Sequence, residues 1–147
     1  MKSRWDWATG QSGDDMNLWA VRGATTIEKD KPEEVLAATR EMLMEIFERN
    51  AIEDKDIVSI IFTVTQDIRS EFPAVAAREL GLTSTPLMCA MEIGKEGSLP
   101  LCIRVLIHFY TGLSKAQIQP VYLNNAVKLR PDLNNSHKSK VESRKTE

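Results

Sequence analysis

The chain has several apolar segments with the composition of strands, but only one long segment with helical hydrophobic spacing. The helical segment places apolar residues along one face from Val35 to Phe47 and ends near Arg49. The strand-like segments, rich in β-branched residues, span residues 18–27, 56–65, 86–93 and 101–110. One helix covers only one face of a sheet, so strands this apolar leave a second face uncovered. A second copy of the same chain is the economical cover for that face.

Capping and turn signals mark the boundaries of the remaining elements. Asp30 is expected to cap the long helix, with Pro32 in its first turn and Glu33 at capping-box spacing. The shorter elements are a helix over 73–80 stopped by Gly81, a helical turn from Ser114 to Gln117, and a last strand or two short pieces at 118–123 and 126–129. The order predicts an α+β (mixed α/β) fold, in which one mixed sheet is covered by one long helix.

Length and composition fit one domain. The chain has 147 residues, a formal net charge of −2 and two cysteines, and it shows neither the basic field of a nucleic-acid-binding protein nor the cysteine spacing of a zinc site. No apolar run has the roughly 18 residues that a membrane span needs, and residues 1–15 lack the apolar region of a signal peptide. We expect a poorly ordered extension over 1–15, a domain over 16–133, a flexible polar tail over 134–147, and a cytoplasmic location.

Single charges inside apolar strands are the features that point to a function. Arg104 has only apolar neighbours for three residues on either side, and strand alternation places it on one face with Cys102, Leu106 and His108. Glu92 stands alone after an equally apolar run. A buried guanidinium requires an anion and hydrogen-bond acceptors. Arg104 and Glu92 could therefore form a structural ion pair between strands, or they could bind a ligand; the spacing leaves both readings open.

Three arginines and a tyrosine at the ends of other elements could join such a site. Arg22 precedes Gly23, whose missing side chain would let a ligand approach the backbone. Arg78, Arg130 and Tyr122 each have an ordinary structural explanation, but arginines at the ends of several strands, with one carboxylate, would suit a small polyanionic ligand. The chain has no GxGxxG, P-loop, HExxH or CxxC motif.

Six blocks of residues in this order resemble the monofunctional bacterial chorismate mutases of the trimeric AroH class, over about residues 16–133. The blocks are Val21-Arg22-Gly23-Ala24-Thr25-Thr26, Phe72-Pro73-Ala74, Arg78-Glu79-Leu80, Cys89 to Glu92, Cys102-Ile103-Arg104-Val105, and Val121-Tyr122-Leu123 through Ala126-Val127 to Leu129-Arg130-Pro131-Asp132-Leu133. The resemblance implies a pseudo-α/β-barrel homotrimer with active sites between subunits. It also implies the rearrangement of chorismate to prephenate, without metal or cofactor, in phenylalanine and tyrosine biosynthesis.

The resemblance also implies a role for each matching residue. Arg104 would lie at the ether oxygen of the substrate, Glu92 and Cys89 would hold the ring hydroxyl, and Arg22 would bind a carboxylate together with Tyr122. The remaining residues would complete the pocket or its rim: Phe72, Ala74, Arg78, Leu87, Met88, Leu129 and Arg130. Of these, Arg78 would add positive charge at the cleft mouth, and Arg130 would help to order the C-terminal segment.

Two positions depart from the family pattern. Val75 stands where the family often has a basic residue, and Gln66 stands where proline is frequent. These departures would weaken long-range attraction for a dianion and alter the loop before Ile68. A noncatalytic trimer of the same fold that binds a small anion is the alternative function, because one fold can serve unrelated functions. Neither alternative involves nucleic acid or a membrane.

Overall fold

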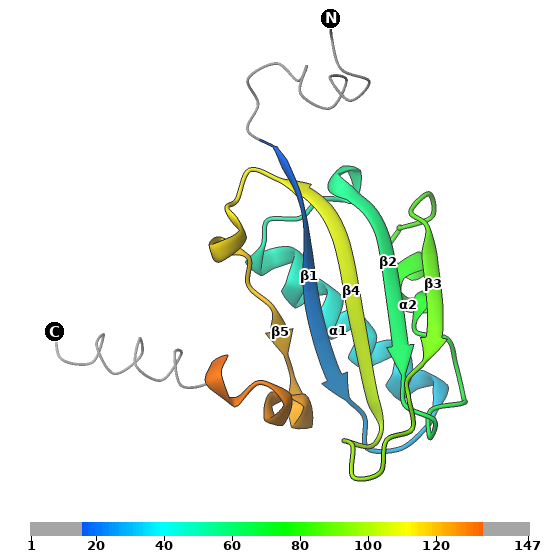
Figure 1. Ribbon diagram of the computed structural model, residues 1–147. Helices are drawn as coiled ribbons and strands as arrows, with labels where there is room; N and C mark the ends of the chain where they lie inside the picture. Colours follow the sequence, from blue (N-terminus) through cyan, green and yellow to red (C-terminus); the bar gives the residue numbers. More distant parts are fainter. Residues whose placement is uncertain (1–15, 134–147) are drawn as a thin grey trace, which may run out of the picture.

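A computed structural model describes residues 16–133, and within them the chain forms one five-stranded sheet. The strand order across the sheet is β3-β2-β4-β1-β5 (Figure 1). The strands are β1 (Asn17–Thr26), β2 (Ile57–Val64), β3 (Leu87–Met91), β4 (Cys102–Thr111) and β5 (Val121–Tyr122). The extension and the tail expected at 1–15 and 134–147 lie outside the described residues.

The sheet is mixed, as the sequence predicts. Central strand β4 runs antiparallel to β1 and β2, whereas β5 pairs parallel with β1 and β3 pairs parallel with β2. The helices are α1 (Pro32–Arg49) and α2 (Ala74–Glu79), with 3-10 turns at 54–56, 115–117 and 124–129. Each strand and helix expected from the sequence is present within a few residues, and the last segment forms the two short pieces that were one of its alternatives.

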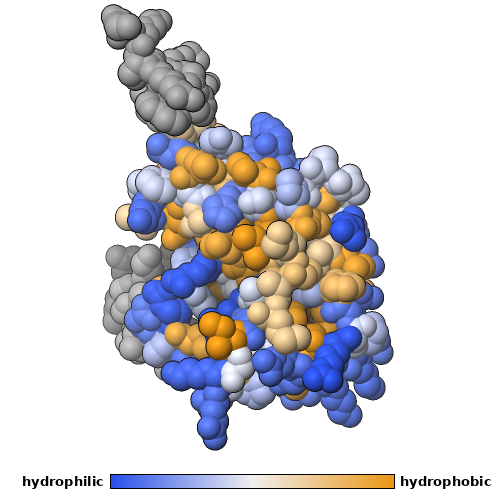
Figure 2. All heavy atoms as spheres, turned by 45° about the vertical axis from the view of Figure 1, so that its right-hand side comes forward, coloured by the Kyte–Doolittle hydropathy of each residue, from blue (hydrophilic) through white to orange (hydrophobic). Residues whose placement is uncertain are grey.

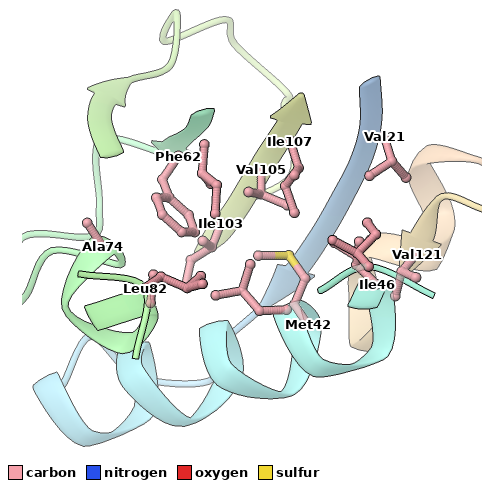
Figure 3. Close-up of a cluster of buried hydrophobic side chains, with 14 of the residues drawn as sticks. Val21, Met42, Ile46, Phe62, Ala74, Leu82, Ile103, Val105, Ile107 and Val121 are labelled. Carbon is pink, nitrogen blue, oxygen red and sulfur yellow. The ribbon is translucent and has the colours of Figure 1, made fainter. Parts of the chain in front are cut away.

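Both helices lie on the same side of the sheet, behind the strands in Figure 1. The hydrophobic core fills the space between these helices and the sheet. Alternate residues of β4, from Ile103 through Val105 and Ile107 to Phe109, are buried against Met42 and Ile46 of α1. Figure 3 shows this layer, with side chains of β4 and β2 pointing toward α1. Neither α1 nor α2 lies over the opposite face of the sheet, where the short 3-10 turn at 124–129 packs against Ala24 and Cys102. We call this face the open face.

The helix start differs from the expectation. Lys31 is the N-cap residue of α1 and makes no side-chain capping bond, while Pro32 occupies the first position as predicted. The Asp30 carboxylate instead accepts hydrogen bonds from the backbone amides of Arg69 (2.9 Å) and Ser70 (3.2 Å). Hydrogen bonding from the Ser70 side chain, together with these amides, lowers the pKa of Asp30. Asp30 therefore anchors the loop that leads to α2, a long-range partnership that local spacing cannot reveal.

Gly23 serves packing and not ligand approach, contrary to the sequence-based suggestion. It faces the helices, and a Cβ built on it would lie 2.6 Å from Ile46 Cδ1 of α1 and 3.3 Å from the carbonyl oxygen of Val121. The close contact between α1 and β1 thus depends on the absent side chain. Among the described residues, no helix is long and apolar enough to cross a membrane.

Gly23→Ala is expected to lower the free energy of unfolding by about 1–3 kcal/mol, because the new methyl group overpacks a full core. Ile46→Val removes the clashing Cδ1 and alone should cost about 0.5–1.5 kcal/mol. The double variant should be clearly more stable than the sum of the two losses predicts. Urea unfolding of the four proteins measures this coupling; strict additivity would show that the two residues do not compete for space.

Candidate active site

One row of side chains crosses the open face from edge to edge. The strand register pairs Ala90 of β3 with Thr63 of β2, Thr63 with Arg104 of β4, Arg104 with Ala24 of β1, and Ala24 with Tyr122 of β5. Residues paired across neighbouring strands point to the same face. Ala24 flanks the arginine on one side and Thr63 flanks it on the other. The Arg104 side chain is therefore longer than its neighbours in the row and extends beyond them.

Arg104 pairs with Glu92, which follows β3. Arg104 Nε lies 2.9 Å from Glu92 Oε1, and the Thr63 hydroxyl donates to the same oxygen at 2.7 Å. The ion pair that the sequence allowed is therefore present. Arg104 is not buried, contrary to the expectation from its apolar neighbours: its side chain is 45% exposed, whereas that of Glu92 is 16% exposed. A guanidinium held by one nitrogen at a partly open surface still has donors to offer a ligand.

Arg22 and Arg130 line a groove of about 730 Å³ on the side of β1 that faces β5. Arg22 lies two residues before Ala24 and so shares the open face with Arg104. Arg130 sits 6.0 Å above the Tyr122 ring and makes two hydrogen bonds to Asp132, at 2.9 and 3.1 Å. The Asp132 side chain raises the pKa of Arg130, which keeps a fixed positive charge beside Tyr122. We call Arg22, Glu92, Arg104, Tyr122 and Arg130 the open-face cluster.

A second group of predicted site residues surrounds α2 on the other face of the sheet. Cys89 pairs in register with Phe62, whose side chain is buried in the helix-covered core. Burial raises the pKa of the Cys89 thiol, while the backbone amide of Ala74 and the charge of Arg78 act in the opposite direction. Phe72, just before α2, is 68% exposed. We call Phe72, Ala74, Arg78 and Cys89 the α2 cluster.

Within one chain the structure does not bring the two clusters together. Cys89 and Glu92, to which the resemblance gives one shared role, lie on opposite faces because they are three positions apart along an extended segment. Leu87 belongs to the helix-covered side with Cys89, and Met88 to the open face. Leu129 packs beside Tyr122 against the small buried cluster that contains Cys102.

Thr63 is the site residue that sequence reasoning missed. Its signal was present, because it is the polar residue in the segment Ile60-Ile61-Phe62-Thr63-Val64, but threonine is common in strands and attracts no notice there. Within residues 16–133, no group of three His, Cys, Asp or Glu side chains is arranged to hold a metal ion. The chemical resources of the open face are therefore cations, one carboxylate and hydroxyl groups.

Comparison with known proteins identifies the relatives of this arrangement. The family model described as chorismate mutase type I matches residues 18–133. The chorismate mutase AroH of Thermus thermophilus is 46% identical over 114 residues, which cover 77% of this chain and 93% of that protein. The AroH protein of Bacillus subtilis (strain 168) is 41% identical over 119 residues, covering 80% and 94%. A solved chorismate mutase from Clostridium thermocellum superposes with a TM-score of 0.73 at 52% identity, covering 74% of this chain and 96% of that one.

The contacts of Cys89 predict how it reacts with iodoacetamide. Its raised pKa should make alkylation slower than that of a free thiol at neutral pH and shift the rise in rate to higher pH. Arg78→Ala should slow the reaction further, because the arginine favours the thiolate; Arg49→Ala is the matched control. Cys102 is fully buried and should stay unmodified in the folded protein. Mass spectrometry of the alkylated peptides reads both sites, and faster labelling in Arg78→Ala would contradict the assigned contact.

Proposed function

The chain belongs to the chorismate mutase type I family and is a chorismate mutase, an isomerase; we propose that it converts chorismate to prephenate with the open-face cluster, in sites completed by a neighbouring subunit. The observation that carries this proposal is the placement of Arg104. It stands on the open face, tied through Nε to Glu92 and flanked by Ala24 and Thr63.

The reaction asks for a particular kind of site. Chorismate is a dianion, and its rearrangement breaks a C–O bond while a C–C bond forms within the same molecule. No nucleophile is needed, and the protein must hold a compact conformer and stabilise charge on the departing ether oxygen. The cationic groups of Arg22 and Arg104 and the hydrogen-bonding carboxylate of Glu92 meet these needs.

Arg104 is the proposed electrostatic catalyst. Its guanidinium would face the ether oxygen, where negative charge grows only as the bond lengthens, so the interaction favours the transition state over the bound substrate. Glu92, held on the same guanidinium, would accept a hydrogen bond from the ring hydroxyl. The existing ion pair sets the positions of both groups before substrate arrives, which reduces reorganisation during the reaction.

Arg22 and Tyr122 are proposed to hold a substrate carboxylate at the β1–β5 side of the face. Arginine offers paired donors that match a carboxylate, and the tyrosine hydroxyl adds a third. Arg130 would keep the Tyr122 ring in place through its position over the ring and its bonds to Asp132. Leu129 and Met88 would supply apolar contacts.

The α2 cluster is proposed to come from the adjacent subunit of a homotrimer. Two observations support this. The open face carries exposed apolar residues that include Leu18, Met88 and Tyr110, and Figure 2, with the β3 edge turned forward, shows apolar surface across the middle of that view. The predicted site residues also divide into two clusters on opposite faces. A head-to-tail ring would cover the apolar surface and join the open-face cluster of one chain to the α2 cluster of the next.

The noncatalytic anion-binding alternative is not favoured, because the matched family and the compared relatives are chorismate mutases. The activity places the enzyme in aromatic amino acid biosynthesis. A cytoplasmic location is proposed as well, in keeping with cysteines that form no disulfide among the described residues.

Replacing Arg104 with citrulline, a neutral isostere, should lower kcat about 100-fold or more, as for loss of a preorganised oxyanion donor. KM should change less, because the ether oxygen carries little charge in the ground state. Loss of chorismate followed by ultraviolet absorbance, with prephenate identified as product, measures both. Arg49→Ala is the control, since Arg49 pairs with Glu45 on α1, away from both clusters.

A purely structural role for the ion pair predicts a different result. The neutral residue would leave the largely buried Glu92 carboxylate without its partner and lower the melting temperature. A citrulline variant with a lowered melting temperature and a normal kcat in its folded fraction would contradict the catalytic assignment.

Shared sites predict complementation between inactive variants. Arg104→Ala disables the open-face cluster, and Arg78→Glu places a carboxylate where it would repel the dianion. When the two are unfolded, mixed and refolded, about one site in four should draw both intact clusters from a trimer of random composition and recover activity. A mixture of Arg104→Ala with Arg22→Ala should recover none, because both changes lie in one cluster. Sedimentation as a trimer without recovery in the first mixture would contradict site sharing.

A further inference from the structure

The Glu92 carboxylate is held from two directions by residues of the open face. Its Oε1 atom accepts a hydrogen bond from the Thr63 hydroxyl at 2.7 Å and forms an ion pair with Arg104, whose Nε lies 2.9 Å away. Its backbone amide donates to the carbonyl oxygen of Val64 at 2.9 Å, which fixes the chain just beyond β3. Both contacts are made at Oε1, and within residues 16–133 Oε2 accepts no hydrogen bond.

This arrangement differs from the one that arginine and a carboxylate adopt when nothing else intervenes. A free pair favours two parallel hydrogen bonds, with both oxygens engaged by the guanidinium. Here Arg104 uses Nε, and a second donor already shares the accepting oxygen. A bidentate pair would occupy Oε2 together with a terminal guanidinium nitrogen, the two groups that the proposed reaction requires for the ring hydroxyl and the ether oxygen.

We infer that Thr63 is a positioning residue of this enzyme: its hydroxyl holds Glu92 in a one-oxygen contact with Arg104 and so keeps both groups available to the substrate. The inference rests on the proposed function of Arg104 and Glu92. Thr63 itself touches the carboxylate and acts through it.

The fold gives no other reason for a hydroxyl at position 63. The side chain lies on the open face and is only partly buried, and valine matches threonine in shape and in preference for strands. The backbone pairing of Thr63 with Ala90 and Arg104 does not involve the hydroxyl. Within residues 16–133, its hydroxyl has the Glu92 carboxylate as its hydrogen-bond partner.

Thr63→Val is expected to lower kcat about tenfold, the effect of one hydrogen bond to a charged group, while KM changes by less than about threefold. Thr63→Ser, which keeps the hydroxyl, should stay within about threefold of the parent in both. Thr39→Val is the matched control: it also removes a hydroxyl that donates at 2.7 Å, to the carbonyl of Val35 in the core, and it should leave kcat unchanged. A Thr63→Val enzyme with the kcat of the parent overturns the inference.

Two further comparisons keep the test decisive. If Thr63→Val does not fold, Thr63→Ser and Thr63→Ala differ only in the hydroxyl, and equal kcat values for this pair overturn the inference. In a Glu92→Ala background, Thr63→Val should change the residual kcat by less than about twofold, because the hydroxyl acts only through the carboxylate. A full tenfold loss in that background overturns it as well. A parent enzyme that forms no prephenate would instead contradict the proposed function.

Discussion

One face of β4 packs in the hydrophobic core and the other carries the candidate site, and the rest of the structure depends on this division. One face buries four large apolar side chains against α1 and α2, and the other carries Arg104 in a surface that neither of these helices covers. Arg104 protrudes from a central strand whose other face is packed in the core, so its Cα has little freedom and the core beneath it positions the guanidinium. A well-packed core on the helix side thereby fixes the position of Arg104 on the open face.

Partial exposure of Arg104 lowers the free-energy cost of desolvating its charge. A fully buried arginine and glutamate would lose most of their hydration, and their attraction often fails to compensate for that loss. Arg104 remains nearly half exposed, so the isolated fold tolerates its charge. In the proposed mechanism, its environment becomes dry only when substrate and a neighbouring subunit of the trimer cover the face. The proposed attraction between Arg104 and the ether oxygen would then be stronger in the transition state, because the surroundings have a lower dielectric constant.

Local patterns in the sequence predicted the elements of the fold well, because strand composition, helical spacing and capping signals act over few residues. Alternation correctly placed Arg104 with Leu106 and His108, and it failed only on burial, because it does not tell whether a face is covered. Asp30 and Gly23 were misread for a related reason: their partners, the loop at Arg69 and Ile46 of α1, are distant in the sequence. Thr63 was missed because its hydrogen bond to Glu92 joins residues 29 positions apart.

β3 is an edge strand of the described sheet and pairs with β2, so the number of its residues matters more than their composition. Its register with β2 decides which residues face the helices and which face away. An insertion of one residue between Leu87 and Glu92 would turn the carboxylate toward the core, whereas an insertion of two would restore its direction and displace it along the strand. A substitution on β3 therefore leaves this register intact, whereas a change in the number of residues in this short edge strand redirects or displaces Glu92.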